Sequence, residues 1–242
     1  YVAREGMSRA AQMALRPLVS VMKRWDYAAA QRVTHFLAIS TEIQDRIETY
    51  YDRTSEIVYP PVETARFQPS AQVEDYYLIV SRLIPYKRID LAVQAATRLG
   101  VPLKIAGRGR DLDRLRALAG KTVEFLGFVP DADLPDLMAR CKAFLFPGLE
   151  DFGITPVQAQ AAGRPVIAYS GGGALDTVIP DETGALFDTM TVDSLIEAMR
   201  AFDAGAYDPA VLRRHAQRFD TEVFNGAITA AVESHWRAFS VQ

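Results

Sequence analysis

The stretch YYLIVSRLIPYKRIDLAVQAATRLGVPLKIAG, residues 76–107, contains the unit from which the fold of this chain can be predicted. A short apolar run at 76–81 predicts a strand, and a run at 102–107 predicts a second one. Between them, residues 87–100 have helical spacing and end at Gly100. A strand, a helix and another strand joined by short loops are typical of a βαβ unit with parallel strands.

The same alternation continues beyond this unit. It predicts strands at 122–127, 143–147, 165–169 and 184–187, helices between them at 110–120, 131–141, 154–163 and 173–179, and closing helices at 192–202, 208–219 and 221–239. Near-continuous apolar strands between helices indicate a parallel sheet with helices on both faces, so we predict a Rossmann-like α/β fold. Ligands of such sheets bind outside the carboxyl ends of the strands.

The first 62 residues do not follow this alternation. Residues 8–33 have apolar side chains at helical spacing and five basic residues. This predicts an amphipathic helix with a solvated polar face or, alternatively, a basic surface that meets a membrane or a lipid-linked acceptor. Strands predicted at 34–40 and 56–62 are too short to bury their faces as an isolated pair. Because Tyr1 is not a methionine and the next residues read as the approach to a helix, we expect a fragment.

Composition excludes several classes of protein. The chain has 242 residues, of which 49% are hydrophobic and 24% charged, and no apolar run reaches the length of a membrane helix. Its single cysteine, Cys141, excludes an internal disulfide, and its three histidines lack ligand spacing, so we predict no metal. A net charge of −3 gives no reason to expect nucleic acid as a partner. We expect a cytoplasmic protein, with peripheral contact at the inner face of the membrane as a further expectation.

Basic residues gather in the loops after the first two strands of the alternation. Residues 82–110 contain seven Lys and Arg but only one acidic residue, Asp90, although the whole chain is acidic. Cations near helix N-termini oppose the helix dipole, which is easier to explain if an anion binds there. We therefore predict an anion-binding role for Arg82 and Lys87, whereas Arg98 and Lys104 are interpreted as solvated charges.

The glycine-rich loop GRGRDL, residues 107–112, is not a dinucleotide-binding fingerprint. It lacks the third glycine and follows the second strand of the unit, so a tight strand-to-helix turn is the favoured interpretation. The segment DAD at 131–133 resembles a carboxylate pair for a metal, but it stands where a helix N-cap is expected. Neither segment by itself indicates a cofactor.

The segment PGLEDFGITPVQAQAAG, residues 147–163, is the second candidate for a binding loop. Gly153 allows a tight turn into a helix whose first N–H groups are free for an anion. Glu150 at the mouth of this turn can accept hydrogen bonds from sugar hydroxyls. The glycines of SGGG, residues 170–173, are expected to offer backbone N–H groups to a further oxygen. Adjacent Glu150 and Asp151 do not have the separation of a glycosidase carboxylate pair.

These segments resemble a known family. SRLIPYKRIDLAVQA, GFVPDADLPDLMARCKAFLFP, EDFGITPVQAQAAGRPVIAY and GGALDTVIPDETGALF are similar to the carboxyl-terminal half of retaining group 1 glycosyltransferases (glycosyltransferase family four), which have the GT-B fold. The resemblance covers roughly residues 34–240. It implies two Rossmann-like domains, the first for the acceptor and the second for the nucleotide-sugar donor. It places the end of the acceptor domain at 1–62, the donor domain at 63–220, and a helix returning to the acceptor domain at 221–242.

The resemblance also implies roles for individual residues. The family's catalytic residues correspond to Arg82 and Lys87, which would contact the donor diphosphate, and to Glu150, which would contact the transferred sugar. Further donor contacts are implied for the loop Phe152, Gly153, Ile154 and Thr155, for the base-lining residues Gly127 and Val129, and for Gly107 and Gly172.

Position 158 departs from the family pattern. The family has a second acidic residue there, which grips the ribose hydroxyls, whereas this chain has Gln158. Glutamine can still hydrogen-bond a diol, but without the strength that charge adds. The amino-acid sequences of these motifs are similar to those of mannosyltransferases that use GDP-mannose, while UDP-glucose and UDP-N-acetylglucosamine remain alternative donors.

The implied reaction is transfer of a hexose with retention, by front-side attack, to a glycan or lipid-linked acceptor in polysaccharide biosynthesis. The donor is the substrate, and no metal or other cofactor is expected because two cations and a helix end neutralise the phosphates. Two alternatives stay open: a module that binds nucleotide-sugar without turnover, and an epimerase on the same scaffold. We expect this chain alone to be inactive, since acceptor-side residues would come from elsewhere.

Overall fold

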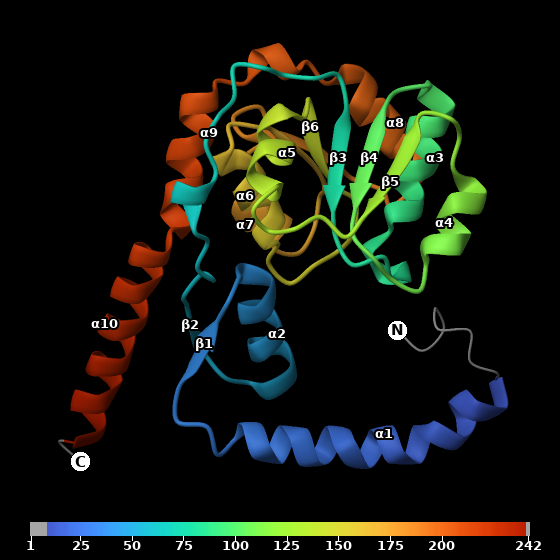
Figure 1. Ribbon diagram of the computed structural model, residues 1–242. Coiled ribbons are helices and arrows are strands. Elements are labelled where there is room, and N and C mark those ends of the chain that lie inside the picture. Colours follow the sequence, from blue (N-terminus) through green and yellow to red (C-terminus); the bar gives the residue numbers. More distant parts are fainter. Residues whose placement is uncertain (1–8, 241–242) are drawn as a thin grey trace.

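A computed structural model describes residues 9–240, and its largest feature is a six-stranded parallel sheet (Figure 1). The predicted start of the first helix at Ser8, like Tyr1 and the last two positions, lies outside the described residues. The strands of this sheet are β3 (Tyr77–Val80), β4 (Leu103–Ala106), β5 (Val123–Gly127), β6 (Ala143–Phe146), β7 (Val166–Tyr169) and β8 (Gly184–Phe187). Their order is β5-β4-β3-β6-β7-β8, and every neighbouring pair is parallel.

Helices cover both faces of this sheet, which confirms the predicted Rossmann-like α/β class (Figure 1). The helices that follow β3 in the chain are α3 (Ile89–Leu99), α4 (Leu112–Leu118), α5 (Leu134–Arg140), α6 (Ile154–Ala161), α7 (Ala174–Thr177), α8 (Val192–Ala201), α9 (Pro209–Ala216) and α10 (Thr221–Ser240), of which α10 lies outside the sheet. Short 3-10 turns lie at Thr64–Arg66, Pro85–Lys87, Ala204–Ala206 and Gln217–Phe219. Helix α3 packs against α8, and α6 packs against α9.

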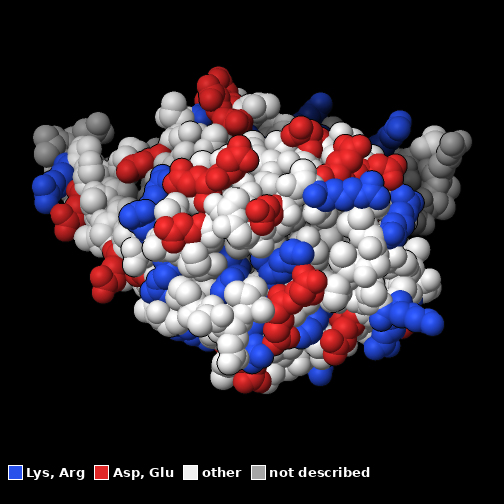
Figure 2. All heavy atoms as spheres, turned by 90° about the horizontal axis from the view of Figure 1, so that it is seen from above, with Lys and Arg blue, Asp and Glu red and all other residues white. Residues whose placement is uncertain are grey.

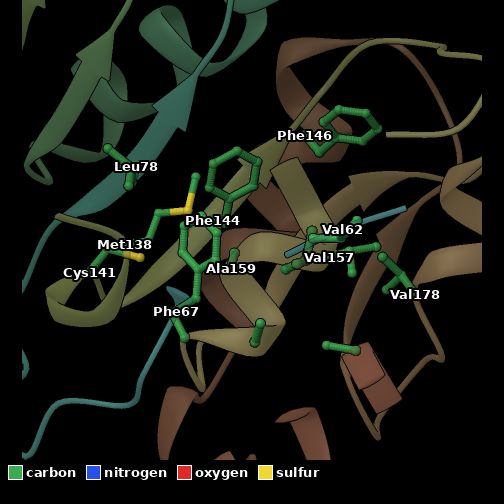
Figure 3. Close-up of a cluster of buried hydrophobic side chains, with 14 of the residues drawn as sticks. Val62, Phe67, Leu78, Met138, Cys141, Phe144, Phe146, Val157, Ala159 and Val178 are labelled. Atoms are coloured by element: carbon green, nitrogen blue, oxygen red, sulfur yellow. The ribbon is translucent and has the colours of Figure 1, made fainter. Parts of the chain in front are cut away.

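Alternating side chains of each strand supply two hydrophobic cores. On β3, Tyr77 and Ile79 belong to the core under α3, α4 and α8, whereas Leu78 joins the core under α5, α6 and α9. Figure 3 shows the second of these cores, where Leu78 and Phe144 lie near Met138 of α5. Because both faces of the strands are buried, the strands read as continuous apolar runs in the sequence.

The residues before β3 form a smaller unit below the sheet (Figure 1). It consists of α1 (Arg9–Ala30), β1 (Phe36–Ala38), α2 (Thr41–Tyr51) and β2 (Ser55–Ile57). The two strands pair with each other in parallel as a two-stranded sheet. Helix α10 runs back beside this unit, where the His235 ring stacks on His35 with 3.8 Å between the ring centres.

The chain passes twice between the small unit and the large sheet, and the two passages lie side by side. Val62 forms a parallel bridge with Asp220, and its N–H donates to the Phe219 carbonyl over 2.8 Å. The Thr64 hydroxyl donates to the Asp220 carboxylate. These contacts lie next to the boundaries predicted at residues 62 and 220, and the division into domains stays a prediction.

Helix α1 carries an apolar face that the described residues do not cover. Leu18, Met22 and Trp25, which the sequence placed on one helical face, have exposed fractions of 54%, 57% and 68%. Helical spacing was predicted correctly, since the helix spans 22 residues with Pro17 inside it. Within residues 9–240, no helix is long and apolar enough to pass through a bilayer.

Candidate functional site

The large sheet changes its direction of winding between β3 and β6. From β3 the strand order continues to β4 and β5, whereas β6 is followed on its other side by β7 and β8. The loops that leave the carboxyl ends of β3 and β6 therefore diverge, which opens a crevice between them. A cleft of about 340 Å³ lies at this point, and Ile39 and Pro60 of the small unit also border it.

Seven residues predicted from the sequence line this cleft. Two of them come from the loop after β3, and five come from the loop after β6 and the start of α6: Arg82, Lys87, Glu150, Phe152, Gly153, Ile154 and Thr155. The loops after β3 and β6 therefore border one hollow. Their roles toward a ligand stay predictions.

Lys87 and Glu150 form an ion pair across the cleft. The Lys87 ammonium donates to Glu150 Oε2, and each side chain is only 16% exposed. The two loops approach closely because Gly148 has no side chain, since a Cβ there would lie 2.8 Å from the Lys87 carbonyl oxygen. The sequence assigned these residues separately to a phosphate and a sugar, and their direct pairing was not predicted.

Arg82 connects the cleft to a second hollow of about 410 Å³. Arg82 is exposed, and among residues 9–240 no ion pair holds its guanidinium. The second hollow is also lined by Gly107 and Val129, as predicted for the donor, and by Arg108, Phe128 and Asp131. The Arg108 guanidinium lies 5.3 Å from the centre of the exposed Phe128 ring.

Helix α6 begins at the cleft. Gly153 precedes it with a φ of 100°, a conformation that favours glycine, and a Cβ there would lie 2.8 Å from the Phe146 ring. No side chain caps the helix, so the N–H groups of Ile154 and Thr155, two residues that line the cleft, have no intrahelical acceptor. Two basic side chains and a helix N-terminus around one hollow form an arrangement suited to a phosphate-like anion.

Three predicted contact residues do not line either hollow. Gln158 is half-buried on α6, one turn after Ile154. Gly127 ends β5, where its carbonyl accepts a 2.6 Å hydrogen bond from the Gly107 N–H. Gly172 has a φ of 61° and lies against the Glu150 backbone, where a Cβ would come within 2.3 Å of the carbonyl oxygen.

The glycine triplet at 171–173 braces the loop that carries Glu150. The Gly173 N–H donates to the Glu150 carbonyl over 2.8 Å, and the Gly171 N–H donates to the Tyr169 carbonyl over 2.9 Å. The expectation that these glycines offer free N–H groups to a ligand is therefore wrong for Gly171 and Gly173. The Gly173 backbone supports the neighbouring loop, whereas the Gly171 N–H closes a turn at the end of β7.

The aromatic ring of Phe152 turns away from the cleft. It is 4% exposed and packs against Tyr59 and Phe219, with ring centres 5.8 and 5.6 Å apart. Phe152 can therefore face a ligand in the cleft through its backbone, while its ring joins the loop to the small unit. Sequence analysis did not identify Tyr59, because an isolated tyrosine after a strand carries no signal of its partner.

The described part of the chain contains no cluster of three or more His, Cys, Asp or Glu residues arranged to hold a metal ion. The DAD segment begins helix α5 at Asp133, but the Asp133 side chain accepts no capping hydrogen bond. Asp133 therefore occupies the N-cap position predicted from the sequence, but its side chain makes no capping hydrogen bond.

Comparison with known proteins gives a family match and several relatives. Residues 62–217 match the family described as glycosyl transferases group 1. A GDP-mannose-dependent alpha-(1-6)-phosphatidylinositol monomannoside mannosyltransferase of Mycobacterium tuberculosis is 31% identical over 193 residues, which are 66% of this chain and 50% of the relative. A glycogen synthase of Pseudomonas syringae is 32% identical over 66% of this chain and 35% of its own length. The chain spans about half the length of the mycobacterial relatives it matches.

Solved structures share the fold at lower identity. Sucrose-phosphate synthase from Thermosynechococcus elongatus aligns with a TM-score of 0.80 and 20% identity, over 90% of this chain and 62% of that one. Anabaena HepE in complex with UDP aligns with a TM-score of 0.74 and 22% identity, over 85% of this chain and 65% of that one.

Proposed function

The chain belongs to the group 1 glycosyltransferases, and we propose that it forms the nucleotide-sugar donor site of a hexosyltransferase that uses GDP-mannose. The observation that carries this proposal is the convergence of Arg82, Lys87 and the start of α6 on one cleft. That cleft lies where the strand order reverses, which is the usual ligand position in open α/β sheets.

The charges of the cleft suit the donor diphosphate. Arg82 is exposed at its rim, and Lys87 lies inside it with Glu150 as a neighbour. The free N–H groups at the start of α6 add hydrogen-bond donors and the positive end of a helix dipole. A diphosphate in this position would be held by two cations and a helix end, so binding needs no metal in this proposal.

The same groups would assist the reaction. When the bond between the sugar C1 and the diphosphate oxygen breaks, its electron pair and negative charge pass to the diphosphate. Arg82, Lys87 and the α6 N-terminus would stabilise that charge, and such preorganised electrostatics is usually the largest catalytic contribution. Glu150 would orient the sugar by accepting hydrogen bonds from its hydroxyls. The acceptor hydroxyl would then attack C1 from the same face, and its proton would leave to the diphosphate.

The second hollow supports guanine as the base. Asp131 lines it, and a carboxylate has two acceptor oxygens that match the N1–H and N2 amino donors of guanine. Uracil offers a single N–H between two carbonyl oxygens, which a carboxylate would repel. The relatives named as GDP-mannose-dependent enzymes point the same way.

The acceptor is proposed to be a glycan or a lipid-linked molecule, as in polysaccharide biosynthesis. The mycobacterial relatives are named for transfer to a phosphatidylinositol mannoside. In this chain, α1 combines exposed apolar side chains with Lys23 and Arg24, which would allow peripheral contact with a membrane surface. Sedimentation of the chain with vesicles containing anionic lipid would measure that contact, and vesicles of neutral lipid would serve as the control.

Calorimetric titration with GDP, UDP, GDP-mannose and UDP-glucose tests the proposed donor. We expect GDP and GDP-mannose to bind more tightly than UDP and UDP-glucose. Asp131→Asn should weaken GDP binding by about tenfold and leave UDP binding nearly unchanged, because a lost charged hydrogen bond costs about 1.5 kcal/mol or more. Tighter binding of UDP would remove guanine from the proposal, and binding of neither nucleotide would remove the donor site.

The alternative of a binding module without turnover is favoured by one observation, the glutamine at position 158. Because the chain spans only half of its mycobacterial relatives, transfer activity of the whole protein is itself part of the proposal.

A further inference from the structure

Glu150 and its neighbour Asp151 face opposite sides of the loop after β6. The Glu150 carboxylate meets Lys87 inside the cleft. The Asp151 carboxylate, which is 56% exposed, pairs instead with Arg46 of α2, with 2.7 Å between Nη1 and Oδ1. The loop is therefore held from inside by Lys87 and from outside by a residue 105 positions earlier in the chain.

The Arg46 guanidinium is itself held in a fixed orientation. Its Nε and Nη2 groups both contact Glu42 Oε1, one turn earlier on α2, at 2.8 and 2.7 Å. A guanidinium bound on one side by its own helix presents its remaining donor in a defined direction. Arg46 thus extends the rigid α2 helix to the loop that carries Glu150.

A second contact joins the small unit to the other support of Glu150. Asp176 of α7 accepts hydrogen bonds from the Thr41 N–H at 3.1 Å, the Thr41 hydroxyl at 2.6 Å and the Tyr59 hydroxyl at 3.0 Å. The residue before α7, Gly173, donates to the Glu150 carbonyl. Both elements next to Glu150, the loop and α7, are therefore fastened to the small unit.

We propose that Arg46 is a positioning residue of the donor site: through Asp151 it sets the orientation of the loop that turns Glu150 toward Lys87. This inference rests on the proposed donor site and adds a residue of the small unit to it. The pair is too exposed to contribute much to folding stability, because exposed ion pairs are worth little. Its effect is instead expected on the placement of the Glu150 carboxylate, where small displacements have large consequences.

The test compares Arg46→Gln with two matched variants. Glu42→Gln removes the helical partner of Arg46 but leaves Asp151 paired, and Arg98→Gln breaks a comparable surface pair with Asp193 far from the cleft. Binding of GDP-mannose and GDP is measured for each by calorimetry, with UDP-glucose and UDP in parallel. Since Glu150 would contact the sugar, Arg46→Gln should weaken GDP-mannose binding about fivefold while GDP binding changes less than about twofold. The melting temperature of Arg46→Gln should match that of the wild type. Arg98→Gln should match the wild type both in melting temperature and in its affinity for GDP-mannose and GDP.

A second measurement does not depend on the ligand. Hydrogen exchange of the backbone around residues 147–153 should become faster in Arg46→Gln and in Asp151→Asn, and the double variant should exchange no faster than either. Equal sugar-nucleotide binding and unchanged exchange in Arg46→Gln would overturn the positioning role while leaving the donor site intact. Failure of the wild type to bind any of the four nucleotides would instead overturn the donor site.

Discussion

The two ends of the parallel sheet carry their charges differently. At the amino ends, basic residues pair with acidic ones on the surface: Lys142 with Asp75 at 2.9 Å and Lys104 with Glu74 at 3.4 Å. Figure 2, which views the molecule from this side, shows acidic and basic side chains interspersed. At the carboxyl ends, Lys87 pairs with Glu150 inside a hollow, whereas Arg82 borders the same hollow with no ion pair among residues 9–240.

The direction of the strands explains this difference. In a parallel sheet, the helices that follow the strands all begin at the carboxyl end, so their free N–H groups gather there. An end that already has positive partial charges gains further cations only at a cost, unless an anion binds. At the amino end, Lys104 and Lys142 have carboxylate partners from the protein itself, whereas Arg82 at the carboxyl end has none among residues 9–240.

The largest expected effect is a loss of nucleotide affinity when a cation is removed at the carboxyl end of the sheet, compared with removal of a cation at the amino end. Arg82→Ala or Lys87→Ala should weaken GDP binding by roughly ten- to a hundredfold, because hydrogen bonds to charged groups are worth about 1.5–3 kcal/mol. Lys142→Ala, at the opposite end, is the matched control and should leave affinity unchanged. Calorimetry measures the affinities. Thermal melts should show similar stability for Arg82→Ala and Lys142→Ala, and lower stability for Lys87→Ala, because that change leaves the largely buried Glu150 carboxylate without its partner. Equal loss of affinity at both ends would mean that general charge, and not the cleft, attracts the nucleotide.

The next effect concerns the start of α6. Gly153→Ala would place a methyl group at a φ of 100° and 2.8 Å from the Phe146 ring, whereas Gly100→Ala has a φ of 67° with open space around it. Both should destabilise the protein, with Gly153→Ala worse by about 1 kcal/mol or more, as for overpacked sites. Only Gly153→Ala should also weaken GDP binding. Urea unfolding measures the free energy of unfolding, and calorimetry measures the affinity for GDP. Equal stability of the two variants would show that the loop adapts to the added methyl group.

A smaller effect is expected at Gln158. Restoring a carboxylate with Gln158→Glu should tighten donor binding by about tenfold or less, because a charge-assisted hydrogen bond to a ribose diol is roughly twice as strong as a neutral one. The measurement is the dissociation constant of GDP-mannose for both proteins. Weaker binding by the glutamate variant would show that the ribose does not lie beside α6.

The smallest effect is a dependence of stability on pH, which is set by His215 of α9. Burial, with help from the charge of Arg218, lowers the pKa of the His215 imidazole. Its Nε2 lies 3.2 Å from the Thr177 carbonyl, so the neutral ring donates there. A lowered pKa in the folded state means that the unfolded chain binds the proton first, so stability falls as the pH drops below the ordinary histidine value.

His215→Gln tests this dependence. Its free energy of unfolding should change less between about pH 7.5 and pH 5.5 than that of the wild type, as measured in urea. An equal loss of stability in both proteins would assign the acid sensitivity to other groups.

Much of the large sheet could be predicted because its signals are local. The apolar run at 76–81 predicted a strand where β3 lies, and the helical spacing of 87–100 predicted a helix where α3 lies. The loops of the site could also be predicted, since Arg82, Lys87, Glu150 and Gly153 all lie in segments that connect a strand to the next helix. The parallel arrangement then brings them to one edge.

What could not be predicted depends on partners far apart in the sequence. The Lys87–Glu150 pair joins residues 63 positions apart, and Arg46–Asp151 joins residues 105 positions apart. No local pattern distinguishes such partners from other surface charges. On α1, spacing identified the residues that share a face, but spacing does not say what covers that face, and Trp25 is 68% exposed.

The most direct test of the central claim is a crystal structure of this chain with GDP bound. The account predicts that the diphosphate lies between Arg82, Lys87 and the first N–H groups of α6, with the guanine in the hollow that contains Asp131. A diphosphate bound at the amino ends of the strands, or along α1, would contradict it.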